Sequence, residues 1–200
     1  MEPLPADQIR VLGVLVEKER TVPDSYPLTL NSLRTGCNQS SNRDPVVAYE
    51  DAEVQAALDA LREAKLIRIV YSPSNRAPKY RHVLDEAWDL DPSELAVLAP
   101  MLLRGPNTAP ELRMRTERYV PAVESVDEAL SSLAARGFVT NIGRGSGQRE
   151  DRWTTVLRAH EPTESASVHT EAPRSGLADR LAALEARVAH LEAQLGIEGE

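Results

Sequence analysis

Hydrophobic and polar positions recur along this chain twice in the same order. Apolar residues at helical spacing followed by a short β-branched run occupy residues 54–70, and the pattern returns 72 residues later at residues 126–142. Apolar spacings of three and four residues predict a helix with one buried face, and the β-branched run predicts a strand. A repeat of this length indicates two copies of one small unit.

Each copy is predicted to contain three helices followed by two strands. In the first copy a helical stripe begins at Ile9, Thr29 can cap a second helix, and a third helix covers residues 51–64. Strands are expected at residues 66–71 and 79–84, on either side of a turn-rich loop.

The second copy carries clearer helix starts. Capping boxes begin at Asp91, Thr108 and Ser125, each with Glu three residues later. Strands are expected at residues 138–142 and 152–157, around a glycine-rich loop. Three helices and a β-hairpin predict a winged helix. The expected fold class is therefore mainly α with small β-hairpins (α+β), with two tandem winged-helix domains and a C-terminal coiled-coil helix.

Composition divides the chain into four parts. We expect winged-helix domain 1 at residues 1–85 and winged-helix domain 2 at residues 86–160. Residues 161–175 have no hydrophobic periodicity and the composition of a flexible linker. Residues 176–196 return to a strongly periodic pattern, which predicts a coiled-coil helix.

The apolar residues of the last part follow a heptad. Their spacings alternate between four and three residues, and they are Leu177, Leu181, Leu184, Val188, Leu191 and Leu195. Arginines at g positions and glutamates at the following e positions could pair between parallel helices. This pattern predicts a homodimer through the coil. The alternative is a single amphipathic helix that folds back on its own domain.

Charge is unevenly distributed. The net charge is −8, and residues 161–200, with three basic and eight acidic residues, supply five of those negative charges. The two repeats are therefore nearly neutral, and each can still present a local basic face. No apolar run reaches the roughly 20 residues of a membrane span, and no signal segment opens the chain. With Cys37 as the single cysteine, we expect a cytoplasmic protein without a membrane partner.

Two longer motifs resemble a known family. The stretches CNQSSNRDPV at residues 37–46 and LRGPNTAPELRMRTER at residues 103–118 are similar to the two signatures of the YceH family. That is an uncharacterised bacterial family built from two winged-helix domains, often with a helical coiled-coil-like tail. The resemblance covers about residues 5–158. It implies a fold and brings no activity, so function has to be argued from the residues.

Basic residues on both hairpins favour binding to duplex DNA. Winged helices place the third helix in the major groove and the hairpin against the phosphate backbone. The candidate contacts on the hairpins are Arg76, Lys79, Arg81, Arg144, Arg149 and Arg152. The alternative is that these side chains are only the solvated edges of two hairpins.

Two further clusters carry groups that bind phosphates or base edges. They are the polar loop with Asn38, Gln39, Asn42 and Arg43, and the arginine-rich second helix of the second copy with Arg104, Arg113, Arg115 and Arg118. Local caps, turns and ion pairs are the ordinary alternative for both clusters.

The third helices argue against deep reading of the major groove. Both begin with carboxylates, at residues 50–53 and 124–128, and carboxylates repel phosphate oxygens. These acidic helices favour the alternative function, a non-enzymatic protein-interaction adaptor similar to the winged-helix subunits of chromosome-organising complexes. A single basic face would favour DNA, and an exposed apolar groove would favour a protein partner.

The sequence predicts no catalytic residue, metal site or cofactor. The glycine-rich run at residues 143–147 joins two strands instead of opening a helix, so it is not a phosphate-binding loop. The four histidines are scattered without metal-ligand spacing, and Cys37 is expected to pack inward. We therefore expect a non-enzymatic, dimeric DNA-binding protein that regulates transcription.

Overall fold

The computed structural model describes residues 3–72, 75–119, 123–145 and 147–158. Over these residues the protein is a mixed α+β structure with seven α-helices and two small antiparallel sheets. The first module, residues 6–82, contains α1 (Ala6–Thr21), η1 (Pro23–Ser25), β1 (Leu28–Thr29), α2 (Leu30–Cys37), α3 (Asp51–Glu63), β2 (Ile67–Ser72) and β3 (Asn75–His82).

The second module, residues 92–155, repeats this order after the short helix α4 (Leu84–Trp88). Its elements are α5 (Pro92–Arg104), β4 (Asn107–Thr108), α6 (Ala109–Thr116), α7 (Val126–Ala135), β5 (Val139–Gly143) and β6 (Arg152–Thr155). The two sheets have the equivalent orders β1-β3-β2 and β4-β6-β5. The predicted repeat of three helices and a hairpin is confirmed, whereas α4 and the two-residue strands β1 and β4 were not predicted.

The helix starts follow the capping residues in the sequence. The Asp91 carboxylate accepts from the backbone N–H groups of Ser93 and Glu94, and the backbone N–H of Asp91 donates to the Glu94 side chain. Thr108 and Glu111 form the same reciprocal pair at α6. Because such pairs satisfy backbone donors that a helix leaves free, these boundaries could be predicted within a residue or two.

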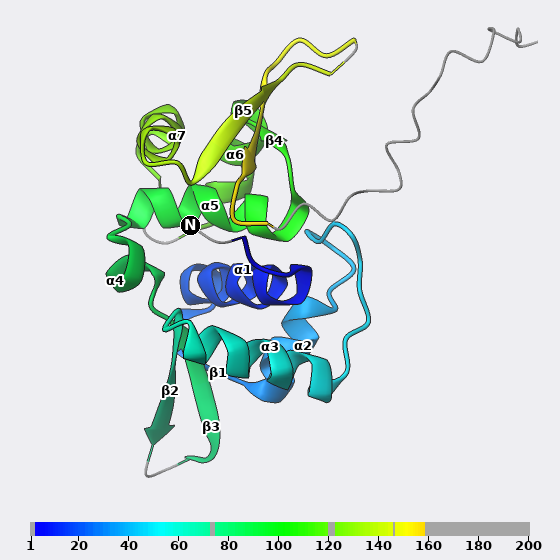
Figure 1. Cartoon of the computed structure of the whole chain (residues 1–200), viewed down its shortest axis with the longest axis vertical. Helices are drawn as coiled ribbons and strands as arrows, with labels where there is room; N and C mark the ends of the chain where they lie inside the picture. Colours follow the sequence, from blue (N-terminus) through cyan, green and yellow to red (C-terminus); the bar gives the residue numbers. More distant parts are fainter. Residues whose placement is uncertain (1–2, 73–74, 120–122, 146, 159–200) are drawn as a thin grey trace, which may run out of the picture. The chain divides into compact units, whose positions relative to one another are not determined.

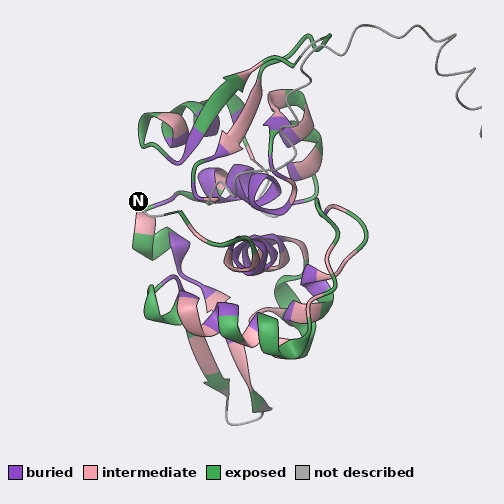
Figure 2. Ribbon diagram, turned by 45° about the vertical axis from the view of Figure 1, so that its right-hand side comes forward, coloured by how far each residue is buried: buried purple, intermediate pink, exposed green. Residues whose placement is uncertain are grey.

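Helices α1 and α5 pack against each other at the centre of the described residues. Both are coloured largely as buried in Figure 2, and the two hairpins lie beyond them at opposite ends (Figures 1 and 2). A Cβ atom on Gly13 would lie 2.9 Å from Leu103 Cδ2, so α1 needs glycine there to approach α5 this closely. The modules thus share one apolar core, and residues 1–160 form one compact unit.

Two further expectations concern membranes and the C-terminal part. Among the described residues, the helices lack the combination of length and apolar character that crossing a bilayer requires. The linker predicted at residues 161–175 and the coiled coil predicted at residues 176–196 lie outside the described residues.

Candidate nucleic-acid interface

The hairpin of β2 and β3 presents a cationic face. Arg68 lies opposite Arg81 in the strand register, and Val70 lies opposite Lys79. Because side chains alternate across a strand, these four share one face of the sheet. The other face packs into the core, where Ile67 and other apolar side chains are buried. The cationic face therefore points to solvent, and the Arg68 side chain is 58% exposed.

The same hairpin lacks acidic residues. Residues 67–82 hold four cations, Arg68, Arg76, Lys79 and Arg81, and no Asp or Glu. The nearest carboxylate comes from α4, where Glu86 pairs with Arg68 Nη2 at 2.6 Å and Arg81 Nη2 at 3.2 Å. One carboxylate thus holds two guanidinium groups, and the face keeps a net positive charge. Sequence reasoning missed Arg68, although its alternation with the apolar residues Ile67 and Ile69 was the signal.

The second hairpin is closer to neutral. Arg144 Nε lies 3.0 Å from Asp151 Oδ1, within the same hairpin. Arg152 donates to the backbone carbonyl of Pro106 at 2.7 Å, and its guanidinium lies 3.9 Å from the Glu111 carboxylate. Arg149 is exposed near the tip of the hairpin. The two hairpins therefore occupy equivalent places and differ in charge.

Both third helices present carboxylates at their exposed starts. Asp51 and Glu53 on α3 are exposed, and so are Asp127 and Glu128 on α7. Asp51 pairs with Arg34 of α2 at 3.2 Å, and Asp127 pairs with Arg113 of α6. Arg113 therefore forms an exposed ion pair between α6 and α7.

The polar loop after α2 is fixed to its own module. Asn38 Nδ2 donates to the carbonyl oxygen of Tyr49, and the N–H of Tyr49 donates to Asn38 Oδ1, both at 2.8 Å. Gln39 Oε1 accepts from Lys18 Nζ at 3.3 Å and from Arg43 Nη2 at 2.9 Å. Both side chains thus take part in internal contacts that hold the loop.

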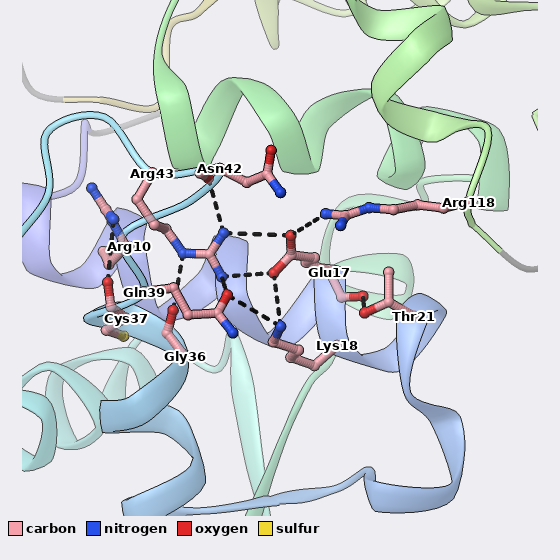
Figure 3. A network of polar contacts seen from close by, with 10 residues as sticks. All are labelled: Arg10, Glu17, Lys18, Thr21, Gly36, Cys37, Gln39, Asn42, Arg43 and Arg118. Atoms are coloured by element: carbon pink, nitrogen blue, oxygen red, sulfur yellow. Dashed lines mark hydrogen bonds and ion pairs between the residues drawn. The ribbon is translucent and has the colours of Figure 1, made fainter.

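Arg43 points into the protein. Its side chain is 0% exposed, and Nη2 lies 2.6 Å from Glu17 Oε2 on α1 (Figure 3). Nε donates to the carbonyl of Gly36 at 2.9 Å, and Nη1 donates to that of Asn42 at 2.9 Å. The physical reason is that Glu17 is buried, and a buried carboxylate requires a counter-ion. Arg43 therefore lies away from the surface on which a nucleic acid could dock.

Glu17 also forms ion pairs with cations from both modules. Lys18 Nζ lies 3.3 Å from Oε2, and Arg118 Nη2, which follows α6, lies 2.7 Å from Oε1 (Figure 3). Burial alone raises the pKa of Glu17, but the hydrogen bonds and charge of Arg43, with the charges of Lys18 and Arg118, outweigh it. The pKa is thereby held below its ordinary value of 4.5. We call Glu17, Lys18, Arg43 and Arg118 the junction network.

The arginines predicted as one cluster around α6 separate into different environments. Arg113 faces α7, whereas Arg115 contacts Asn107 and lies 3.7 Å from the Glu111 carboxylate. Arg118 reaches Glu17 of the first module, and Arg104 lines a pocket with Arg115 and Arg118. The sequence offered one weak signal for the junction network, the glutamate at position 17 directly after the apolar run of residues 11–16.

Cys37 is buried at the end of α2, as expected. Burial raises the pKa of its thiol to about 12, although the charges of Arg10 and Arg43 act in the opposite direction. Among the described residues, no group of three or more His, Cys, Asp or Glu side chains could hold a metal ion.

Together, these features define a class of protein with two repeated helix-and-hairpin modules on a shared core, one hairpin cationic and the other nearly neutral. The sequence profile of the family described as "Protein of unknown function, DUF480" matches residues 4–148. The chain belongs to this family.

Similar proteins extend over nearly the whole chain. A UPF0502 protein of Geobacter sulfurreducens is 46% identical over 194 residues, which cover 92% of this chain and 88% of the relative. A UPF0502 protein of Solibacter usitatus is 42% identical and covers 94% of this chain and 93% of the relative. One of Polaromonas naphthalenivorans is 37% identical, with coverages of 98% and 99%.

Proposed function

We propose that each module is a winged helix and that the protein binds duplex DNA through the hairpin of β2 and β3, acting as a cytoplasmic regulator of transcription. The order of helices and strands supports the winged-helix assignment, since a third helix followed by a hairpin defines that motif. We include in this proposal that the chain is a member of the YceH family, whose signatures residues 37–46 and 103–118 resemble.

The observation that carries this proposal is the cationic face of the first hairpin. Arg68, Lys79 and Arg81 share one solvent-facing side, and the hairpin sequence contains no carboxylate. A row of cations on a solvent-facing hairpin can pair with the phosphates of a duplex, which carries one negative charge per about 1.7 Å of its axis when both strands are counted. Contacts of this kind set position and affinity without reading sequence.

The C-terminal heptad would bring two such hairpins together. A parallel pair of helices at residues 176–196 makes the protein a homodimer with two cationic hairpins. Linking two binding modules raises the overall affinity through effective concentration, so each single hairpin can be weak.

Fluorescence anisotropy with a labelled duplex tests the proposal, with the affinity measured from about 50 mM salt upwards. The double substitution Arg68→Ala with Lys79→Ala should weaken binding across all sequences and reduce the salt slope by about two. The double substitution Arg62→Ala with Lys65→Ala is the matched control, because these two exposed cations lie at the end of α3 and just after it, outside the hairpin. Absence of binding at about 50 mM salt, or equal effects of the hairpin double variant and the control, would overturn the proposal.

A protein-interaction adaptor is the second candidate, favoured by the exposed carboxylates of α3 and α7. In a DNA complex with the third helix in the major groove, Asp51, Glu53, Asp127 and Glu128 would face phosphates. The two candidates separate in the same assay. An adaptor would show no salt-dependent duplex binding, and the hairpin variants would leave its partner binding unchanged.

A further inference from the structure

A pocket of about 390 Å³ lies where the two modules meet. It is lined by Glu17 of α1 and Asn42 of the first module, and by residues of α5 and α6 together with Arg118 and Tyr119. We propose that this pocket binds a small organic anion, one that joins a carboxylate or phosphate group to a compact apolar part. The inference goes beyond DNA binding, because it uses none of the hairpin residues.

Positive charge exceeds negative charge at this pocket. Three arginines line it, Arg104, Arg115 and Arg118, against the single acidic residue Glu17. Glu17 is already compensated from the protein side, because Arg43 and Lys18 also pair with it. The charge of Arg118 is therefore only partly neutralised by Glu17.

Arg104 strengthens this imbalance. Arg104 takes part in none of the ion pairs found among the described residues. Arg115 shares the Glu111 carboxylate, at 3.7 Å, with Arg152 at 3.9 Å. Clustered cations in a concave, partly desolvated site attract an anion more strongly than the same groups on an open surface. Arginine also matches carboxylate and phosphate groups with two parallel hydrogen bonds.

The remaining wall of the pocket is apolar. Pro100 and Leu103 of α5 are buried beneath it, and Met114 of α6 beside it is 62% exposed. An exposed methionine on a helix otherwise rich in charge gives a ligand an adaptable apolar contact. Asn42 adds an amide that, in Figure 3, extends away from the junction network. The volume falls in the range of about 300–1,000 Å³ that is usual for small-molecule sites.

Methionine NMR offers a direct test on the full-length protein. The chain has three methionines, Met1, Met101 and Met114, so ¹³C labelling of their ε-methyl groups gives three signals, and Met114→Leu assigns the one in the pocket. The probes are phenyl phosphate, benzoate and the neutral benzyl alcohol. We expect one or both anions to move the Met114 signal in a saturable way, and the neutral probe to leave it unchanged. Comparing the two anions shows whether the pocket prefers phosphate or carboxylate.

A pair of arginine variants tests the assignment of the site. Arg104→Gln should weaken binding of the preferred anion by about tenfold, because it removes a charged hydrogen-bond donor. Arg113→Gln is the matched control, since Arg113 is on α6 but pairs with Asp127 outside this pocket. A Met114 signal unmoved by either anion, an equal response to benzyl alcohol, or equal affinities of the two variants would overturn the inference. DNA binding by the hairpin is unaffected by any of these results, so the two proposals fail separately.

Discussion

The Arg43 guanidinium donates to the Glu17 carboxylate across 2.6 Å, with side chains that are 0% and 2% exposed. This contact fixes the loop after α2 onto the C-terminal half of α1. Arg118 reaches the same carboxylate from the second module, so Glu17 joins three segments of the chain. Within the polar loop that was predicted to contact nucleic acid, Arg43 is thus part of the protein's interior, whereas Ser40 and Ser41 are exposed.

Removing Arg43 should strongly destabilise the fold. Arg43→Ala leaves the Glu17 carboxylate buried with fewer partners, and breaking a buried ion pair in this way costs about 3–5 kcal/mol. The free energy of unfolding, measured by urea denaturation of the purified variants, tests this prediction. Arg34→Ala is the control, because the Arg34–Asp51 pair is exposed and its loss should cost less than about 1 kcal/mol. Equal decreases in the free energy of unfolding for both variants would show that the buried Arg43–Glu17 pair contributes no more to stability than an exposed pair.

Acidification should reveal the lowered pKa of Glu17. A carboxyl whose pKa is lower in the folded state stabilises the protein above its unfolded pKa. That stability is lost as the pH falls below about 4.5 and through the folded pKa. Glu17→Gln removes this contribution, so the variant should be less stable at neutral pH and lose less on acidification. Denaturation curves at a series of pH values measure the difference.

The acid-dependent loss of stability should be smaller in Glu17→Gln than in the wild type, but it should not disappear. Burial raises the pKa of Glu19, but its contact with His82 and nearby cations outweigh burial, and the pKa is lowered overall. Glu19→Gln therefore serves as the comparison, because it removes the acid-dependent contribution of Glu19 and keeps that of Glu17. Parallel curves of stability against pH for wild type and Glu17→Gln, followed from neutral pH to well below pH 4.5, would contradict the assignment.

Local signals in the sequence predicted the elements well. The Asp91 and Thr108 capping boxes and the hydrophobic spacing at residues 54–61 each depend on contacts within a few residues. The strands β1 and β4 were missed because each is two residues long and exists only through pairing with a distant strand. No local pattern marks such pairing.

The candidate site was harder to predict because its charges depend on tertiary contacts. Arg43 and Arg118 are both arginines after a helix, yet both turn toward Glu17, 26 and 101 residues away in sequence. Arg68 was overlooked because its alternation with Ile67 and Ile69 indicates a solvent-facing position on a strand but does not by itself indicate a DNA contact. Only the register of β2 on β3 places it beside Arg81.

Substitution of Gly13 should weaken the contact between the modules. A Cβ there would lie 2.9 Å from Leu103 Cγ and 3.0 Å from Leu102 Cβ. Although alanine favours a helix by about 1 kcal/mol over glycine, overpacking costs about 1–3 kcal/mol, so Gly13→Ala should be destabilising. A double-mutant cycle with Leu103→Ala should show coupling, because the smaller side chain leaves room. Additive effects in urea denaturation would argue against the close approach.

Removing Glu86 should strengthen binding to duplex DNA. Glu86 pairs with both Arg68 and Arg81, so Glu86→Gln frees two guanidinium groups on the proposed DNA-binding face. Because the pairs are exposed, the stability loss should stay below about 1 kcal/mol. Anisotropy with a labelled duplex should give a higher affinity and a steeper salt dependence. Asp59→Asn is the matched control, since Asp59 pairs with Arg62 on α3. Equal affinities of the two variants for duplex DNA would show that the arginines of this hairpin do not contribute to DNA binding.

The heptad at residues 177–195 predicts that the protein is a dimer whose association depends on the C-terminal part. Leucines and valine at a and d positions would bury an apolar seam, while Arg180 and Arg187 reach glutamates of the partner helix. Light scattering after gel filtration should give twice the monomer mass of 22.0 kDa for the full chain. Leu184→Glu places a charge in the middle of the seam and should return the monomer.

Ala183→Glu is the control for this variant, because position 183 lies outside the a and d positions. The full chain at 22.0 kDa, or a dimer that persists in Leu184→Glu, would show that the heptad does not dimerise the protein. A monomeric Leu184→Glu variant should also bind duplex DNA more weakly than the control, because it presents one cationic hairpin in place of two. Loss of the dimer without any loss of DNA affinity would mean that each hairpin binds on its own.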